Sequence, residues 1–216
     1  MDVRFEHPFS MLIVGASNTG KTTFIRRLLQ LGDKMIKGAP QQIIYCYGAY
    51  QPMFEEMKQE IPNITFIEGV PSDLLDRINP RQRSLLLLDD LMTSLASDTV
   101  ITELMTRLRH LDASIWLIIH NLYYQGRSMR TVHLNTNYYV IFNSPRDRSQ
   151  IMNLARQMYP GEGKFVIDAY NDATKRPYGY LLIDVRPNTP EEFRLRTNIF
   201  PDETQYVYVR REYKRT

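Results

Sequence analysis

A glycine-bounded segment near the start of the chain carries residue types suited to phosphate chemistry. Residues 15–22 fit the pattern G-x-x-x-x-G-K-[ST] without a mismatch. Glycine lets a backbone wrap closely round an anion, and successive N–H groups then form an anion-binding concavity. We therefore predict a phosphate-binding loop in which Lys21 contacts the β- and γ-phosphates of ATP and the Thr22 hydroxyl binds Mg²⁺. The predicted nucleotide-binding residues are Gly15, Ala16, Ser17, Asn18, Thr19, Gly20, Lys21, Thr22 and Thr23.

The residues on either side of this loop provide the context that phosphate binding needs. Residues 10–14 form a short apolar run typical of a buried strand. Residues 23–29 place apolar side chains on one face of a helix. A helix that begins at the loop adds the partial positive charge of its N-terminus to the predicted site.

Two adjacent carboxylates supply the second half of the predicted chemistry. Residues 84–88 include four consecutive leucines, and Asp89 and Asp90 follow directly. Such a run suits a central parallel strand that is buried on both faces, and its carboxyl end lies where open α/β sheets bind ligands. We predict that Asp89 holds Mg²⁺ and that Asp90 orients and deprotonates the attacking water.

Composition and periodicity indicate one α/β domain. The chain has 216 residues, a formal net charge of +3 and a single cysteine, Cys46, so no intramolecular disulfide can form. Further strands are predicted at 42–47, 64–67, 114–119, 138–142 and 178–185, and helices at 52–61, 72–78, 98–110 and 149–158. Alternation of this kind predicts a mostly parallel sheet with helices on both faces.

Two further features predict the class of P-loop NTPase and the limits of the domain. The acidic pair, together with a polar residue at the end of the next strand, favours the RecA-like (ASCE) branch of P-loop NTPases. Residues 1–186 are predicted to form the ATPase domain. From Pro187 onward, prolines interrupt a polar run that becomes basic and tyrosine-rich, which predicts an extended C-terminal tail over residues 187–216.

Several segments downstream of the loop carry a resemblance to a known family. They are His7-Pro8-Phe9, Tyr47-Gly48, Leu88-Asp89-Asp90-Leu91-Met92, residues 121–126, 143–147, 154–160 and 177–184. On these segments the chain resembles FtsK/HerA-type ATPases. More narrowly, it resembles the genome-packaging ATPases of Polinton-like and adintovirus-type elements, which are related to poxvirus and adenovirus-like packaging ATPases.

The resemblance implies an ATP- and Mg²⁺-dependent motor that threads double-stranded DNA into a capsid. It implies a homo-oligomeric ring, pentameric or hexameric, that binds DNA without sequence preference and docks on capsid or portal-vertex proteins. It also implies a location in the nucleus or cytoplasm of a host cell, or with the virion. No apolar run in the sequence approaches the length of a transmembrane segment.

The resemblance further implies a sensor residue, and here the chain departs from the family pattern. Relatives usually carry a polar residue, often Gln, at the end of the strand after the acidic pair. This chain has His120 at that place and Asn121 next, and either side chain is able to hydrogen-bond a γ-phosphate. Many relatives also have Asp-Glu where this chain has Asp89-Asp90.

An arginine finger is expected near the start of the sensor strand. Arg109 is the first candidate and Arg107 the second; the alternative is that both are solvated residues at a helix C-terminus, where cations are favoured. Residues 125–130, which include Arg127 and Arg130, are predicted to form a basic loop. That loop either faces the pore and contacts DNA phosphates or is an ordinary surface loop.

Other function classes share parts of this pattern. A nucleoside or nucleotide kinase uses the same loop but needs an acceptor pocket and usually an arginine-bearing lid. A nucleotide-gated scaffold that binds ATP and turns it over slowly is a second alternative. The acidic pair at the end of a buried strand, followed by a polar strand end, favours hydrolysis over the kinase. An assay of DNA-stimulated ATP turnover separates all three readings.

Overall fold

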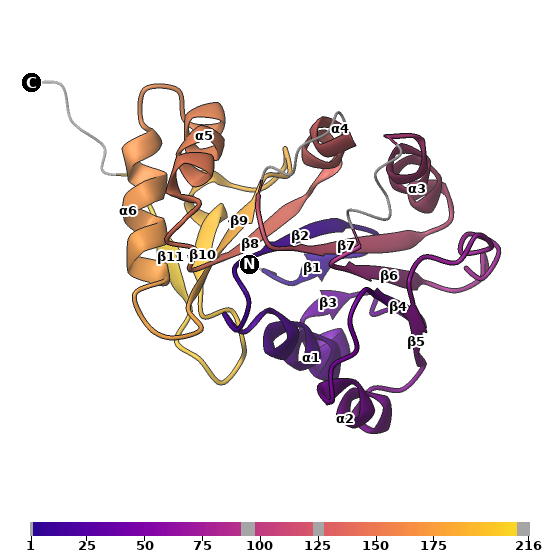
Figure 1. Ribbon diagram of the computed structural model, residues 1–216. Helices are drawn as coiled ribbons and strands as arrows, with labels where there is room; N and C mark the ends of the chain where they lie inside the picture. Colours follow the sequence, from indigo (N-terminus) through magenta and orange to yellow (C-terminus); the bar gives the residue numbers. More distant parts are fainter. Residues whose placement is uncertain (1, 92–97, 123–127, 211–216) are drawn as a thin grey trace, which may run out of the picture.

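A mixed sheet forms the centre of the molecule (Figure 1). The computed structural model describes residues 2–91, 98–122 and 128–210. Within these ranges nine strands form one sheet in the order β11-β10-β9-β8-β2-β7-β6-β4-β5. The strands are β2 (Ser10–Val14), β4 (Gln42–Tyr47), β5 (Ile64–Glu68), β6 (Ser84–Asp89), β7 (Ala113–Ile119), β8 (Tyr138–Phe142), β9 (Tyr180–Asp184), β10 (Leu195–Thr197) and β11 (Tyr206–Tyr208). Neighbours from β5 to β8 are parallel, whereas β9, β10 and β11 pair antiparallel.

Helices cover both faces of this sheet, as Figure 1 shows. On one face lie α1 (Lys21–Leu31) and α2 (Met53–Glu60), and on the other lie α3 (Asp98–His110), α4 (Ser128–Asn135), α5 (Arg148–Met158) and α6 (Gly163–Ala173). A short parallel pair, β1 (Phe5–Glu6) with β3 (Ile36–Lys37), lies apart from the main sheet. Among the helices in the described ranges, none combines the length and apolar character of a membrane-spanning segment.

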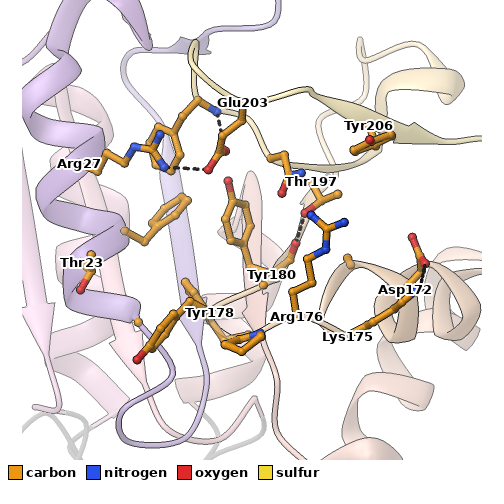
Figure 2. A pocket seen from close by; sticks show the side chains of 18 of the residues that line it. Thr23, Arg27, Asp172, Lys175, Arg176, Tyr178, Tyr180, Thr197, Glu203 and Tyr206 are labelled. Carbon is orange, nitrogen blue, oxygen red and sulfur yellow. Dashed lines mark hydrogen bonds and ion pairs between the residues drawn. The ribbon is translucent and has the colours of Figure 1, made fainter.

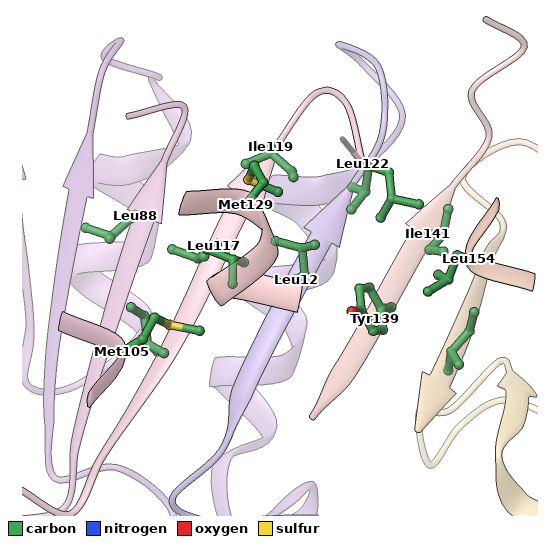
Figure 3. Packing of buried hydrophobic residues seen from close by; sticks show 14 of the residues in the cluster. Leu12, Leu88, Met105, Leu117, Ile119, Leu122, Met129, Tyr139, Ile141 and Leu154 are labelled. Carbon is green, nitrogen blue, oxygen red and sulfur yellow. The ribbon is translucent and has the colours of Figure 1, made fainter. Parts of the chain in front are cut away.

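The uninterrupted apolar runs of the central strands follow from this two-sided covering. In β6, Leu85 and Leu87 belong to the apolar cluster beneath α1 and α2, whereas Leu86 and Leu88 belong to the cluster beneath α3 to α6. Figure 3 shows part of the latter cluster, where Leu88 and Leu117 lie near Met105 of α3. Successive side chains of a strand point to opposite faces, so a strand buried on both sides needs apolar residues at every position.

The observed architecture confirms the predicted fold class. The order of the strands also determines where the phosphate loop and the acidic pair lie. Strand β7 lies between β2 and β6, so the phosphate loop that follows β2 and the carboxylates that end β6 flank the same central strand. Because the three strands are parallel, their carboxyl ends meet at one edge of the sheet. The phosphate loop and the carboxylates of the acidic pair are therefore brought to one place.

Some predicted elements differ from the structure. Residues 72–77 form turns instead of a helix, because Pro71 and Pro80 leave too little chain for a stable helix. The predicted loop at 125–130 becomes helical from Ser128, where α4 begins, while residues 123–127 lie outside the described residues. Helix α6 was not predicted at all.

The prediction of an extended tail from residue 187 is wrong for its first part. Strand β10 pairs antiparallel with β9, and β11 pairs with β10, so residues as far as Tyr208 extend the sheet. The prolines that suggested a tail lie in the connections: Pro187 and Pro190 precede β10, and Pro201 lies between β10 and β11. Strands this short carry too few residues for a visible alternation, and distant partners stabilise them.

Candidate active site

The loop between β2 and α1 has a close-packed backbone that depends on its glycines. A Cβ on Gly15 would lie 2.7 Å from the Cβ of Phe142 and 2.8 Å from the Thr19 hydroxyl. Gly20 has φ +98°, a conformation that side chains disfavour, and it directly precedes α1. The first backbone N–H groups of a helix have no partner inside it, so this end of α1 offers donors to an anion.

Lys21 lies at the centre of the loop. Its side chain is buried, and its ammonium Nζ donates to the carbonyl oxygens of Gly15 and Ala16, at 2.6 and 2.8 Å. Burial lowers the pKa of Lys21, while the negative charges of Asp89 and Asp90 act to raise it. The fold thus brings together the lysine and the acidic pair that are nearly 70 positions apart in the sequence.

The Thr22 hydroxyl has a partner that the sequence did not suggest. It donates to Gln51 Oε1 at 3.0 Å. Gln51 lies between β4 and α2, just beyond the carboxyl end of a strand next to β6. Its position after a strand was the only available signal, and many loop residues share that signal.

Asp89 is a buried carboxylate, with 7% of its surface exposed. Tyr45 of the neighbouring strand β4 donates its hydroxyl to Asp89 Oδ2 at 2.7 Å. Burial raises the pKa of Asp89, and the Tyr45 hydrogen bond and the charge of Lys21 act against that rise. The hydrogen bond fixes one carboxylate oxygen, and the other accepts no hydrogen bond from the described residues and can bind a cation.

Asp90 differs from its neighbour in both conformation and exposure. It has φ +56°, in the left-handed region, and its N–H donates to the carbonyl oxygen of Ile118 at 3.1 Å. Its side chain is 61% exposed and lies 3.4 Å from Nε2 of His120. The reversal of the backbone at Asp90 turns its carboxylate away from the buried strand and towards solvent, where a water molecule can reach it.

The two sensor candidates face different neighbours. His120 lies beside Asp90 at the end of β7. Asn121, with its amide oriented to donate, lies 3.3 Å from Asp147 Oδ2, and Ser144 donates to the same oxygen at 2.6 Å. His120 is therefore the candidate that the fold places next to the acidic pair, while Asn121 is tied to the segment after β8.

The arginine candidates lie elsewhere. Helix α3, which carries Arg107 and Arg109, ends next to the start of β7, at the edge of the sheet opposite the phosphate loop. Arg107 is exposed and pairs with Glu103 at 2.8 Å. Arg130 is an exposed residue of α4; the side chain of Arg109 and the whole of Arg127 lie outside the described residues. Arg107, held by Glu103 at the edge of the sheet opposite the phosphate loop, is not placed to reach the loop of its own chain.

The oxygen atoms of Thr22 and Asp89 fit an Mg²⁺ ion that is bound together with phosphate. They do not form a site in which protein side chains alone would hold a metal. Within the described residues, no group of three or more His, Cys, Asp and Glu side chains is arranged to hold a metal ion. Thr22 and Asp89 instead offer one hydroxyl and one carboxylate at the same edge of the sheet. Mg²⁺ at phosphate sites takes few protein ligands and completes its shell with phosphate oxygens and water, which suits this donor set.

A cavity of about 490 Å³ opens beside the start of α1 (Figure 2). Gly20 and Thr23 line one side of it, and residues of the 172–180 segment and the strands β10 and β11 line the other. A further cavity, of about 520 Å³, touches Ala16, Asn18 and Thr19 and shares residues 175–179 with the first. The sequence named residues 177–184 only among the segments that carry the family resemblance, and it suggested no site residue within 172–180.

No protein-family model matches the chain, and no curated protein matches its sequence. Solved structures do match its fold. They include the genome packaging NTPase B204 from Sulfolobus turreted icosahedral virus 2 in complex with AMPPCP, with 12% identity, a TM-score of 0.57, and 93% of this chain and 97% of that chain covered.

Other matches come from cellular organisms. The cytoplasmic domain of the Type VII secretion ATPase EccC from Thermomonospora curvata has 13% identity and a TM-score of 0.56, covering 87% of this chain and 25% of that chain. A KaiC-like protein from Pyrococcus horikoshii has 13% identity and a TM-score of 0.52, covering 95% of this chain and 91% of that chain. The chain therefore has the fold of the RecA-like P-loop ATPases.

Proposed function

We propose that this protein hydrolyses ATP at the edge of the sheet where β2, β6 and β7 end. The observation that carries the proposal is that Lys21 of the phosphate loop lies close to two carboxylates at the end of β6, of which Asp89 is buried and Asp90 exposed. A cation, a metal-binding carboxylate and a solvent-facing carboxylate are the groups that phosphoryl transfer to water needs.

Each residue has a distinct part in this reaction. The N–H groups at the start of α1 and the Lys21 ammonium bind the β- and γ-phosphates and stabilise the charge that develops on them. Thr22 and Asp89 would hold Mg²⁺, which when bound would supply Lewis acidity to the phosphate oxygens. Asp90 accepts the proton of the attacking water, and His120, 3.4 Å away, orients that carboxylate.

We further propose that hydrolysis drives a ring-shaped motor that moves double-stranded DNA, as in the packaging of a viral or virus-like genome. The match to a viral genome packaging NTPase over nearly the whole of both chains supports this proposal. In this motor Arg109, which belongs to the C-terminal turn of α3, would act as the finger on a neighbouring subunit's nucleotide.

The first test is ATP turnover by the purified protein with and without duplex DNA. We expect DNA to stimulate turnover, and the stimulation to weaken as salt rises, because the contacts are to phosphates. Lys21→Ala should abolish turnover, while Lys164→Ala, which removes an exposed lysine of α6, should not. Phosphate transferred to a nucleoside instead of released to water would identify a kinase and overturn the proposal.

Mixing of variants tests the ring. Arg109→Ala keeps an intact phosphate loop and Asp90→Asn keeps an intact arginine, so each alone should be nearly inactive. A finger is worth on the order of 10³ in turnover. Mixed rings contain some interfaces with both groups, so activity should partly return. Continued inactivity, in rings shown to exchange subunits, would argue against Arg109 and leave Arg107, Arg127 and Arg130.

A further inference from the structure

The cavity beside the phosphate loop has walls that suit a flat aromatic ligand. Phe24 of α1 packs edge-on against Tyr180 of β9, with ring centroids 4.9 Å apart, and against Phe142 of β8 at 5.9 Å. These buried rings form a firm base. Tyr178 and Tyr206 lie at the rim with 71% and 54% of their surfaces exposed, so large aromatic faces there remain available to a ligand.

Tyr178 is held at the mouth of the cavity by a tight turn. It has φ +62°, which is unusual for a bulky residue. The next residue must be glycine, since a Cβ on Gly179 would lie 2.3 Å from the carbonyl oxygen of Ala173. The turn brings the Tyr178 ring against the phosphate loop, where a Cβ on Gly20 would lie 3.1 Å from it. Unusual backbone held in place beside a candidate site points to a functional role.

Among the charged side chains that line the cavity, the guanidinium of Arg176 differs from the others in its pairing. Arg27 pairs with Asp202 and Glu203, and Asp172 accepts a hydrogen bond from the Tyr208 hydroxyl at 2.9 Å. The guanidinium of Arg176, by contrast, makes no ion pair with any described residue. It points into the cavity in Figure 2 and also lines the neighbouring cavity that touches Ala16, Asn18 and Thr19.

We propose that this cavity holds the nucleoside half of the bound nucleotide, with a purine base stacked on Tyr178 and Arg176 placed between the base and the phosphates. The inference rests on the proposed function, because the phosphate loop must hold the other half. A volume of about 490 Å³, aromatic walls and a continuous path to Gly20 and Thr23 fit a nucleoside joined to phosphates bound at the start of α1.

This assignment gives the C-terminal strands a role in nucleotide binding. The Arg27 ion pairs with Asp202 and Glu203 join α1 to the connection between β10 and β11. The Tyr208 hydrogen bond joins β11 to α6. These two attachments hold the outer wall of the cavity in place, so the tyrosine-rich segment contributes to ATP binding by its own subunit.

Calorimetric binding of ATP, AMP and inorganic tripolyphosphate tests the inference. Tyr178→Ala should weaken ATP binding by roughly 5- to 100-fold, which is the range expected for one lost base–aromatic stack, and should weaken AMP binding similarly. Tripolyphosphate has no base, so its affinity should be unchanged. Tyr178→Phe keeps the ring and should restore most of the ATP affinity.

A matched control and a second variant complete the test. Leu134→Ala removes an equally exposed apolar side chain from α4, on the other face of the sheet, and should bind all three ligands as the wild type does. Tyr206→Ala should weaken ATP binding without changing tripolyphosphate binding. Circular dichroism melting checks that each variant is folded.

The outcomes separate this inference from the proposed function. Wild-type binding of tripolyphosphate together with unchanged ATP affinity in Tyr178→Ala and Tyr206→Ala would overturn the nucleoside site and leave the phosphate loop standing. A wild-type protein that binds neither tripolyphosphate nor ATP would overturn both. Loss of tripolyphosphate binding in Tyr178→Ala would also overturn the inference, because it would place the ring on the phosphates.

Discussion

The parallel part of the sheet and its antiparallel edge are built in different ways. In the sheet order from β4 to β8 the strands are buried along most of their length, and the candidate catalytic side chains lie at their carboxyl ends, whereas β5 at the parallel edge is partly exposed. From β9 to β11 the strands shorten, and the outermost, β11, exposes Tyr206 and Val207. The first region holds the candidate catalytic groups on buried strands, whereas the second lines the cavity beside them. Precise placement therefore depends on buried strands, and ligand contact on the exposed edge.

The largest expected effect is on ATP turnover and comes from the carboxylates at the end of β6, in the parallel part of the sheet. Asp90→Asn should keep Mg-ATP binding and lower turnover by about 10²- to 10⁴-fold, because the attacking water loses its base. Asp89→Asn should instead weaken the dependence on Mg²⁺. Turnover at several Mg²⁺ concentrations distinguishes the two variants. Normal hydrolysis by Asp90→Asn together with inactive Asp89→Asn would mean that the two roles are exchanged.

Stability should also separate the two regions. Leu87→Ala empties a fully buried position of β6 and should lower the free energy of unfolding by about 2–5 kcal/mol. Val207→Ala, at a position of β11 that is 42% exposed, should change it by about 0.5 kcal/mol or less. Urea denaturation measures both. Similar losses in the two variants would show that the antiparallel edge is as tightly built as the parallel part.

The pH dependence of stability tests the burial of Asp89. The pKa of Asp89 in the folded state is raised above 3.8, chiefly by burial. The protonated side chain therefore favours the folded state below the unfolded pKa, and this contribution to stability is lost as pH rises through the folded pKa. Asp89→Asn should therefore be more stable than the wild type at pH 7, and the difference should shrink as pH falls towards 3.8. A variant less stable at pH 7 would show that the Tyr45 hydrogen bond outweighs burial.

Different parts of the site were predictable to different degrees. Lys21, Thr22 and the acidic pair follow from local patterns, because a glycine loop and a run of leucines ending in carboxylates each have a meaning within a few residues. Gln51 and Tyr45 carry no such signal. Their roles arise because β4 lies beside β6, and that neighbour relation depends on the pairing of the whole sheet.

The C-terminal part also shows that local sequence patterns do not reveal pairing between distant segments. Prolines and polar residues after residue 187 suggested a tail, yet pairing with β9 makes β10 and β11 part of the sheet. Tyr206 and Tyr208 belong to the tyrosine-rich run that was assigned to this tail. In the fold they line a cavity next to the phosphate loop. Short strands have weak local preferences, so long-range pairing decides their structure.

The sequence by itself determined the phosphate loop, the acidic strand end and the α/β alternation, because each is set by chemistry or periodicity within a short window. Only the tertiary structure decided that β7 separates β2 from β6, that Asp89 is buried while Asp90 is exposed, and that Tyr178 lies against Gly20. These features depend on contacts between residues far apart in the chain, and such contacts form only when the sheet assembles.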